Sequence, residues 1–166
     1  SYRTRQSYTA KVVEPITIPH DELRRKINAR AVNYLSRREY SRTELHKKLS
    51  KAFENYTSDD AHAQLIGQVL DELHKNNWQS DKRYAAQMSK VKGEKFGVAR
   101  LKHEFKQSGL SEDLVEQELA LLKSTELERA RVIWLRKFGS PPVDLKEKAK
   151  QARFMASRGF CYEIVS

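Results

Sequence analysis

The chain contains few of the residues that interrupt helices or build oxidised frameworks. Among its 166 residues are 6 Gly, 4 Pro and a single Cys. The shortage of Gly and Pro favours long helices over a loop-rich or disordered chain. One cysteine excludes an internal disulfide framework and suits a reducing cytosol. We expect Cys161 to be a small buried or half-buried side chain rather than a nucleophile.

Long apolar runs are missing as well, and acidic residues are in deficit. No stretch approaches the length of a membrane span and no signal segment opens the chain, so we expect a cytoplasmic protein with no membrane partner. The 32 Lys and Arg residues outnumber the 22 Asp and Glu residues, which gives a formal charge of +10. Such an excess favours a polyanionic partner, either nucleic acid or an acidic protein surface.

The pattern that is present is helical from Asp21 onward, whereas residues 1–20 lack a helical period and are interpreted as an N-terminal arm. The first helix is predicted to end near Tyr40. Ser41 and Glu44 then form a capping box, which predicts a second helix running to about Phe53. A third helix would bury the residues Leu65, Ile66, Val69, Leu70 and Leu73.

This three-helix pattern returns twice along the chain. Pairs of an aromatic and a small residue follow each basic helix, and two glycines occupy positions typical of left-handed C-caps; these features are Tyr40-Ser41, Phe96-Gly97, Phe138-Gly139, Gly109 and Gly159. A second capping box, Thr125 to Glu128, predicts the start of the third unit. We therefore predict an all-α fold, an elongated and curved tandem of about three three-helix repeats with nine helices. The expected segments are an arm at 1–20 and repeats at 21–78, 79–123 and 124–166.

The apolar positions of the later units predict their cores. In the second unit they are Tyr84, Met88, Val91, Leu101, Phe105, Leu114, Val115, Leu119 and Leu122. In the third they are Leu127, Ala130, Trp134, Phe138, Leu145, Ala149, Ala152 and Met155. We interpret Trp78 and Trp134 as packing anchors rather than as a base-stacking platform. Only residues 162–166 remain for a last helix, so the third unit is either truncated or ends in a single turn.

Catalytic and metal chemistry find little support in the sequence. His103-Glu104 begins like the helix of a zinc protease, but position 107 is Gln107 rather than histidine. The other histidines, His20, His46, His62 and His74, lack ligand spacing and are expected at the surface. The acid pairs Asp59-Asp60 and Glu112-Asp113 lie where helices should start, as caps. We expect no catalytic residue, no metal and no cofactor; a nuclease or hydrolase is a distant alternative.

Four segments in order resemble the RecX family of regulatory proteins: 34–45, 69–78 with 80–85, 96–101 with 107–111, and 154–160. The resemblance covers about residues 29 to 165 and implies a fold of tandem three-helix repeats without enzymatic activity. It implies a partner, the RecA recombinase filament on DNA, whose ATP hydrolysis, strand exchange and co-protease function the protein would limit during DNA repair and recombination. Direct contact with single- or double-stranded DNA is left open. Gln151 departs from the family pattern, since an apolar residue is more usual there.

The basic helix faces are the candidate contact sites, because they recur next to the repeat boundaries. These residues are Arg37, Arg38, Arg42, Lys95, Arg100, Lys102, Lys106, Arg136, Lys137, Arg153 and Arg158. Lys and Arg on an amphipathic helix are ordinarily solvated, so the set carries more weight than any member. We expect a monomer. The alternative from another class is a stand-alone basic helical DNA-binding protein using the same residues.

Overall fold

The structure, a computed structural model, describes residues 14–56 and 60–161, and within these ranges it contains seven α-helices and no strand. The helices are α1 (His20–Leu35), α2 (Arg42–Ala52), α3 (Asp60–Lys75), α4 (Asp81–Gly93), α5 (Val98–Gln107), α6 (Glu112–Lys137) and α7 (Leu145–Ser157). The all-α class is confirmed, while the nine-helix count is not. Most of the expected arm and the last predicted turn, residues 1–13 and 162–166, lie outside the described residues, as does Asp59.

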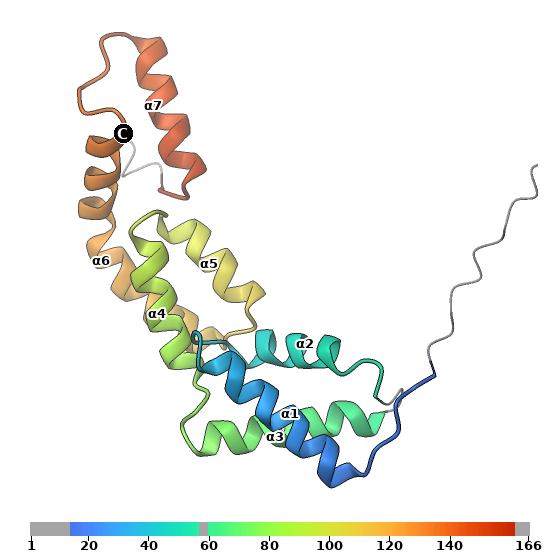
Figure 1. Cartoon of the computed structure of the whole chain (residues 1–166). Helices are drawn as coiled ribbons and strands as arrows, with labels where there is room; N and C mark the ends of the chain where they lie inside the picture. Colours follow the sequence, from blue (N-terminus) through green and yellow to red (C-terminus); the bar gives the residue numbers. More distant parts are fainter. Residues whose placement is uncertain (1–13, 57–59, 162–166) are drawn as a thin grey trace, which may run out of the picture.

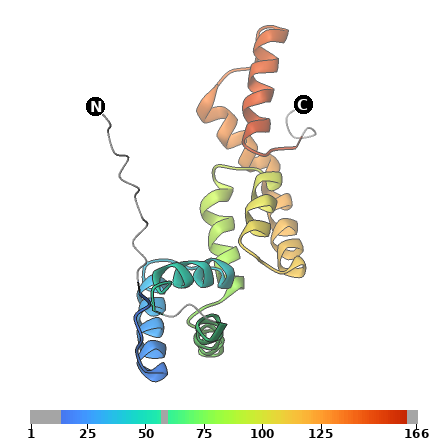
Figure 2. The same ribbon diagram turned by 90° about the vertical axis from the view of Figure 1, so that its right-hand side faces the viewer.

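The helices form three groups that follow one another along a curve (Figure 1). The first group is α1 to α3, the second is α4, α5 and the first half of α6, and the third is the second half of α6 with α7. A view turned by 90° shows the groups one above the other rather than packed into a sphere (Figure 2). The second helix of each group, α2, α5 and α7, lies on the inner side of the curve (Figure 1).

The first group has the largest core. Leu23, Ile27 and Ala31 recur every four residues along α1, so one face of this helix is buried against α2 and α3. The predicted end of this helix near Tyr40 is wrong, because α1 stops at Leu35. The chain turns there, and Tyr40 instead folds back into the core with only 5% of its surface exposed.

The start of α2 is confirmed at the predicted capping residue. The hydroxyl oxygen of Ser41 accepts a hydrogen bond from the amide of Glu44 at 3.1 Å, and α2 ends at Ala52 with Phe53 as its C-cap. The reciprocal half of the box is not made, since the Glu44 carboxylate accepts from Arg38 instead. Before α1, the amide of Ile16 donates to the carbonyl of Asn55 at 2.6 Å, which ties this part of the expected arm to the first group.

The second predicted capping box is wrong, because Thr125 lies inside α6. Its hydroxyl donates to the carbonyl of Leu122 at 3.3 Å instead of capping a helix start. No Gly or Pro occurs between Glu112 and Lys137, so nothing in this segment interrupts helix propagation. The position 123/124 therefore lies within a continuous helix that serves both the second and the third group.

The third core is small, and several predicted core positions are exposed. Ala130, Met155 and Phe160 form this core, against which Trp134 packs half-buried. The inward positions predicted for Val91, Leu127, Ala149 and Leu145 are wrong, since these side chains are exposed; Leu145, 84% exposed, is the first residue of α7. Trp78 is not a packing anchor either.

The position of Trp78 follows from the turn between α3 and α4. Asn77 adopts a positive φ of 61°, so the chain reverses there and Trp78 is left 54% exposed. The neighbouring Gln79 is buried instead, and its amide donates to the carbonyl of Tyr40 at 3.2 Å and to Asp81 at 3.0 Å. This turn thus places a polar group, not an indole ring, at the boundary between the first two groups.

Two further expectations are corrected by burial. Cys161 is exposed rather than buried or half-buried. His62, expected at the surface, is buried at the start of α3 with 9% of its surface accessible, whereas His20, His46, His74 and His103 are exposed or half-buried. Glu112 and Asp113 occupy the first turn of α6 as predicted, behind the capping hydroxyl of Ser111.

Candidate basic interface

The same kind of junction joins each group to the next. Gly109 and Gly159, with φ of 73° and 89°, confirm the two predicted left-handed C-caps. The end of α5 contacts the first turn of α2, where the hydroxyl of Ser41 donates to the carbonyl of Ser108 at 2.8 Å. The end of α7 contacts the first turn of α5, where the amide of Gly97 donates to the carbonyl of Arg158 at 2.8 Å. Helices α7, α5 and α2 therefore follow one another head to tail, with C-terminal carbonyls facing N-terminal donors.

Glycine is required at these contacts for space as well as for backbone conformation. A Cβ atom on Gly109 would overlap the side chain of Thr43 in α2. A Cβ atom on Gly159 would lie 2.8 Å from the backbone nitrogen of Arg100 in α5. Each junction is thus a close approach of backbone to the preceding inner helix, which fixes the angle between neighbouring groups.

Polar contacts on the outer side hold the second junction in place. The Arg129 guanidinium donates to the carbonyls of Gly93, Phe96 and Leu122 at 2.7, 2.8 and 2.9 Å, which satisfies the end of α4. Partial burial lowers the pKa of Arg129 from its ordinary value. The buried carboxylate of Glu126 accepts from the first amide of α5, that of Val98, at 3.3 Å. One long helix thereby anchors both ends of the α4–α5 loop.

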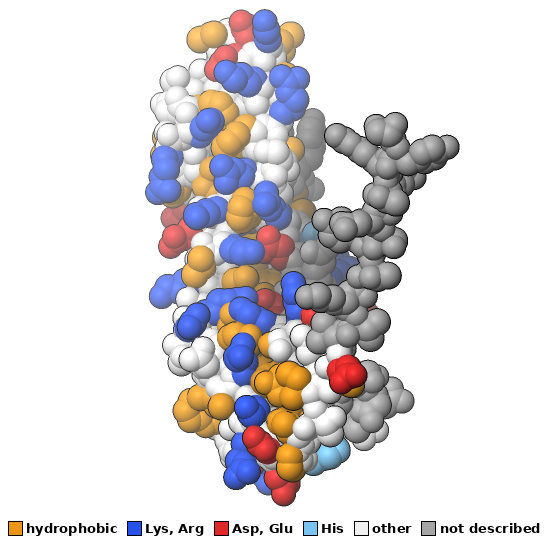
Figure 3. Space-filling model, turned by 45° about the vertical axis from the view of Figure 1, so that its right-hand side comes forward, with side chains coloured by type: hydrophobic (Ala, Val, Ile, Leu, Met, Phe, Trp, Pro, Cys, Tyr) orange, Lys and Arg blue, Asp and Glu red, His pale blue; other side chains and the backbone are white. Residues whose placement is uncertain are grey.

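Charge is segregated between the inner helices and the rest of the described chain. Every exposed charged residue of α2, α5 and α7 is basic: Lys47, Lys48, Lys51, Arg100, Lys102, Lys106, Lys146, Lys148, Lys150 and Arg153. We call this set the basic inner face, because the three helices lie on the inner side of the curve; its members are spread over the exposed sides of these helices. The acids of these helices, Glu44, Glu104 and Glu147, are half-buried, and Glu104 accepts from Lys92 of α4 at 2.6 Å. Figure 3 shows Lys and Arg side chains along the whole length of the face turned forward there, with fewer acidic ones between them.

The residues predicted as contact sites are not all equally available. Arg100, Lys102, Lys106 and Arg153 belong to the basic inner face. Arg37, Lys95, Arg136 and Lys137 are exposed at helix ends or in the loop before α5. Arg42 is engaged within the molecule, because its guanidinium lies 2.6 Å from the carboxylate of Asp71 and donates to the carbonyl of Gly67. Arg38 is engaged too, with the Glu44 carboxylate at 3.0 Å.

Three predicted cations gather where α5, α6 and α7 meet. The Arg100 guanidinium lies 3.8 Å from the centre of the Phe96 ring, and Arg158 lies 5.5 Å from the same ring and 5.2 Å from that of Phe154. The Lys137 ammonium lies 5.3 Å from the Phe154 ring. Cation–π attraction to these rings holds the charges together at one surface.

Sequence reasoning missed part of the basic inner face. The missed residues are Lys47, Lys48, Lys51, Lys146, Lys148 and Lys150. The lysines of α7 alternate with other residues, a spacing that spreads them around a helix and gives no stripe. None of the acids on these helices falls at an exposed position, which distinguishes the basic face. Exposure, however, can be known only once the fold is known.

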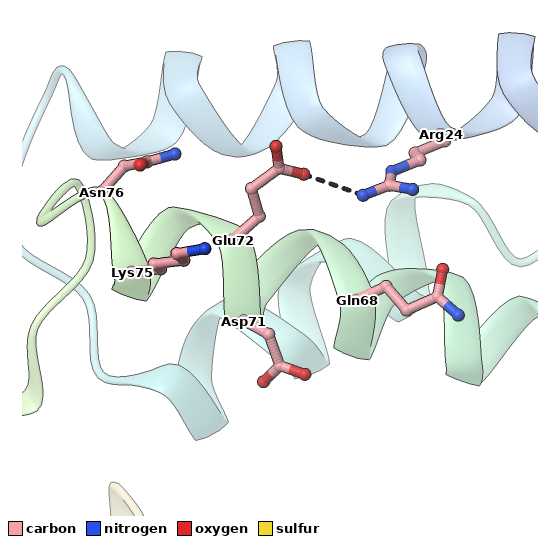
Figure 4. A pocket seen from close by; sticks show the side chains of 6 residues that line it. All are labelled: Arg24, Gln68, Asp71, Glu72, Lys75 and Asn76. Atoms are coloured by element: carbon pink, nitrogen blue, oxygen red, sulfur yellow. Dashed lines mark hydrogen bonds and ion pairs between the residues drawn. The ribbon is translucent and has the colours of Figure 1, made fainter.

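A concavity of about 470 Å³ lies between α1 and α3, and its charge differs from that of the basic inner face. Arg24 of α1 donates to Glu72 of α3 at 2.8 Å, while Asp71 points away from this pair toward its own partner Arg42 (Figure 4). The lining carries both signs of charge and is largely self-neutralised, so it offers an anion no comparable attraction.

No group of three potential metal ligands occurs among the described residues. None of the helices in the described ranges is long and apolar enough to cross a membrane.

Known proteins resemble this chain in sequence and in fold. The family model described as RecX, third three-helix domain, matches residues 124–166. A regulatory protein RecX of Ralstonia pickettii is 43% identical over 140 residues, which is 84% of both chains. The chain belongs to the RecX family. A RecX relative in Ralstonia nicotianae is 41% identical over the same share of each chain, and such relatives are named regulatory proteins rather than enzymes.

The fold agrees with a solved RecX structure. The crystal structure of RecX from Lactobacillus salivarius aligns with a TM-score of 0.69 over 87% of this chain and 93% of that chain. Only 20% of the aligned residues are identical, so this comparison speaks to the fold alone. The fold of this chain is therefore shared with a RecX protein that differs widely from it in sequence.

Proposed function

We propose that this RecX-family chain regulates the RecA recombinase by binding, as a monomer in the cytoplasm, in the helical groove of the RecA–DNA filament. There it limits ATP hydrolysis, strand exchange and the co-protease function that belong to DNA repair and recombination. The chain has no catalytic role of its own in this scheme. It acts by holding neighbouring recombinase protomers in a fixed relation, or by occupying the groove that DNA must enter.

The single observation that carries the proposal is the basic inner face. Its residues lie on α2, α5 and α7, which follow one another head to tail on the inner side of the curve. A row of helices with one sign of charge can follow a groove across several protomers, whereas a compact sphere of equal mass would reach one. A filament that carries DNA supplies the matching negative charge.

The test is single-strand-dependent ATP hydrolysis by RecA, titrated with this protein at ratios well below one molecule per protomer. Inhibition at such ratios supports a regulator that acts on the polymer, since a one-to-one binder would require equimolar amounts. A parallel measurement with labelled DNA and no recombinase gives the intrinsic DNA affinity. Unchanged ATP turnover at saturating ratios, with DNA binding retained, would contradict the proposal.

That last result would favour the second candidate function, a stand-alone basic DNA-binding protein. The segregation of charge supports this candidate as well, because a phosphodiester backbone is attracted by any continuous basic face. The two functions differ in what they require. A filament regulator binds far better when recombinase is present, whereas a stand-alone protein binds equally with and without it.

A further inference from the structure

The two junctions between helical groups have the same plan but differ in charge. Tyr40 and Phe96 each precede the N-cap of an inner helix, Ser41 and Gly97 respectively. The third residue of the inner helix is Glu44 in α2 but Arg100 in α5. The C-cap that contacts this helix from the next group is Ser108 in the first junction but Arg158 in the second. At these two equivalent positions the first junction has a carboxylate and a hydroxyl, and the second junction has two guanidiniums.

The first junction is neutralised from within. The Arg38 guanidinium lies 3.7 Å from the centre of the Tyr40 ring and donates to the Glu44 carboxylate at 3.0 Å. The hydroxyls of Tyr84 and Ser108 share a hydrogen bond of 2.8 Å behind this pair. The Arg38 cation of the first junction thus already has its anion, and the other cation at the Tyr40 ring, Lys48, donates to the Tyr40 hydroxyl at 3.0 Å.

The second junction has no such anion among the described residues. Arg100, Arg158 and Lys137 surround the Phe96 and Phe154 rings at the distances given above, and none forms an ion pair within residues 14–56 and 60–161. Stacking leaves the edges of a guanidinium, which carry its N–H donors, free to bind an oxyanion. Holding the cations on rings also removes part of their rotamer freedom before a ligand arrives.

We propose that the Arg100–Arg158–Lys137 cluster is a binding site for a backbone phosphate of nucleic acid. A phosphate offers more acceptor oxygens than a carboxylate does. It therefore suits a cluster of two guanidiniums and an ammonium better. The cations already lie over both rings, so the site reads the backbone and not the bases. Exposed Lys102, Lys106 and Arg153 continue the positive charge along α5 and α7, which suits a polyanion. The proposal goes beyond filament regulation and holds whether or not recombinase is inhibited.

The test is the binding of a fluorescein-labelled oligothymidine to the full chain, followed by anisotropy at several salt concentrations without recombinase. For R100Q/R158Q we expect affinity to fall at least about tenfold at roughly 0.1 M salt. The magnitude of the slope of log affinity against log salt should fall by about 0.7, since the cluster binds one phosphate and each phosphate contact on a single strand contributes about 0.7. A mixed-sequence strand should show the same loss, because the bases are not read.

The matched control is R38Q, which removes the stacked guanidinium of the first junction. Its cation is already paired with Glu44, so affinity and salt slope should stay at the wild-type values. A second variant, R100E, places a carboxylate beside Arg158 as Glu44 lies beside Arg38, and should bind weakest while remaining helical by circular dichroism. Wild-type affinity in R100Q/R158Q, or an equal loss in R38Q, would overturn the proposal. So would retained DNA affinity with lost binding to polyglutamate, which would make the cluster a protein contact.

Discussion

Gln151 lies buried between α6 and α7, with 6% of its surface exposed. Its amide oxygen accepts a hydrogen bond from the Trp134 indole at 2.9 Å, and its amide nitrogen donates to the carbonyl of Ser140 at 3.3 Å. In the sequence this residue is only a departure from the family pattern. The structure explains it, since the amide joins the Trp134 ring to the loop that precedes α7.

We predict that Gln151→Leu destabilises the protein by about 1 to 3 kcal/mol despite the greater hydrophobicity of leucine. The substitution leaves the Trp134 N–H and the Ser140 carbonyl without their partner in a partly buried setting. Chemical denaturation followed by circular dichroism measures the change in unfolding free energy. Equal or greater stability of the variant would show that this amide contributes nothing to the third group.

Tyr84 reports on the first junction through its ionisation. Burial raises the pKa of Tyr84 to about 12, against a smaller opposing effect of its hydrogen bond with Ser108. Nearby Tyr40 responds the opposite way, because the Lys48 ammonium, 3.0 Å from its hydroxyl, lowers its pKa. Two tyrosines close to one junction should therefore titrate in different pH ranges.

The raised pKa of Tyr84 predicts a loss of stability at high pH. The folded chain keeps this proton more tightly than the unfolded chain, so the contribution is full below pH 10 and is lost as pH rises toward about 12. The difference in unfolding free energy between wild type and Tyr84→Phe should shrink by about 1 to 2 kcal/mol across that window. Chemical denaturation of both proteins at pH 9 to 12 measures this difference. A difference independent of pH would mean that Tyr84 ionises normally in the folded protein.

At the scale of the element, the sequence predicts helix caps correctly where a few neighbouring residues determine them. The Ser41 cap and the left-handed Gly109 and Gly159 depend on a few neighbouring residues, and all three were predicted correctly. Thr125 carries the same local pattern as Ser41 but lies within α6, because the residues before it propagate the helix and a hydroxyl can donate to its own backbone. A capping pattern is decisive only where the preceding residues do not themselves form a helix.

The burial of particular side chains was harder to predict for a related reason. Leu127, 57% exposed, lies on the helical segment shared by two groups, where α6 turns different faces to the second and third cores. A single apolar stripe is the expectation for a helix with one partner, and α6 does not satisfy that condition. Tertiary placement, and not periodicity, decides which face of such a helix is covered.

The junction glycines give a graded prediction for the elements they join. Gly159→Ala should cost more than about 2 kcal/mol, because a left-handed residue then gains a Cβ that overlaps the backbone of Arg100. Gly139→Ala, also left-handed but 3.5 Å from its nearest neighbour, should cost about 1 kcal/mol. Gly67→Ala, inside α3 with open space around it, should stabilise by about 0.5 to 1 kcal/mol. Denaturation midpoints rank the three variants, and equal costs at Gly159 and Gly139 would contradict the close junction.

At the scale of the whole molecule, the candidate site was partly visible in the sequence. Composition indicated a polyanionic partner, and Arg100, Lys102 and Lys106 were singled out near a repeat boundary. The structure adds what composition cannot contain, namely that α2, α5 and α7 lie on one side and that their acids are withdrawn from the exposed surface. The structure also shows that Arg42 is engaged in an ion pair with Asp71, a residue far from it in the chain.

The measurement that tests the account most directly compares two charge reversals in the RecA ATP hydrolysis assay. K102E/K106E changes the basic inner face on α5, and K123E/R131E changes the same number of exposed charges on α6, which lies on the outer side of the curve (Figure 1). We predict that the inner variant needs at least about tenfold more protein for half-inhibition, while the outer variant behaves as wild type. Equal inhibition by both variants, or an equal loss in both, would contradict an inner-face contact with the filament.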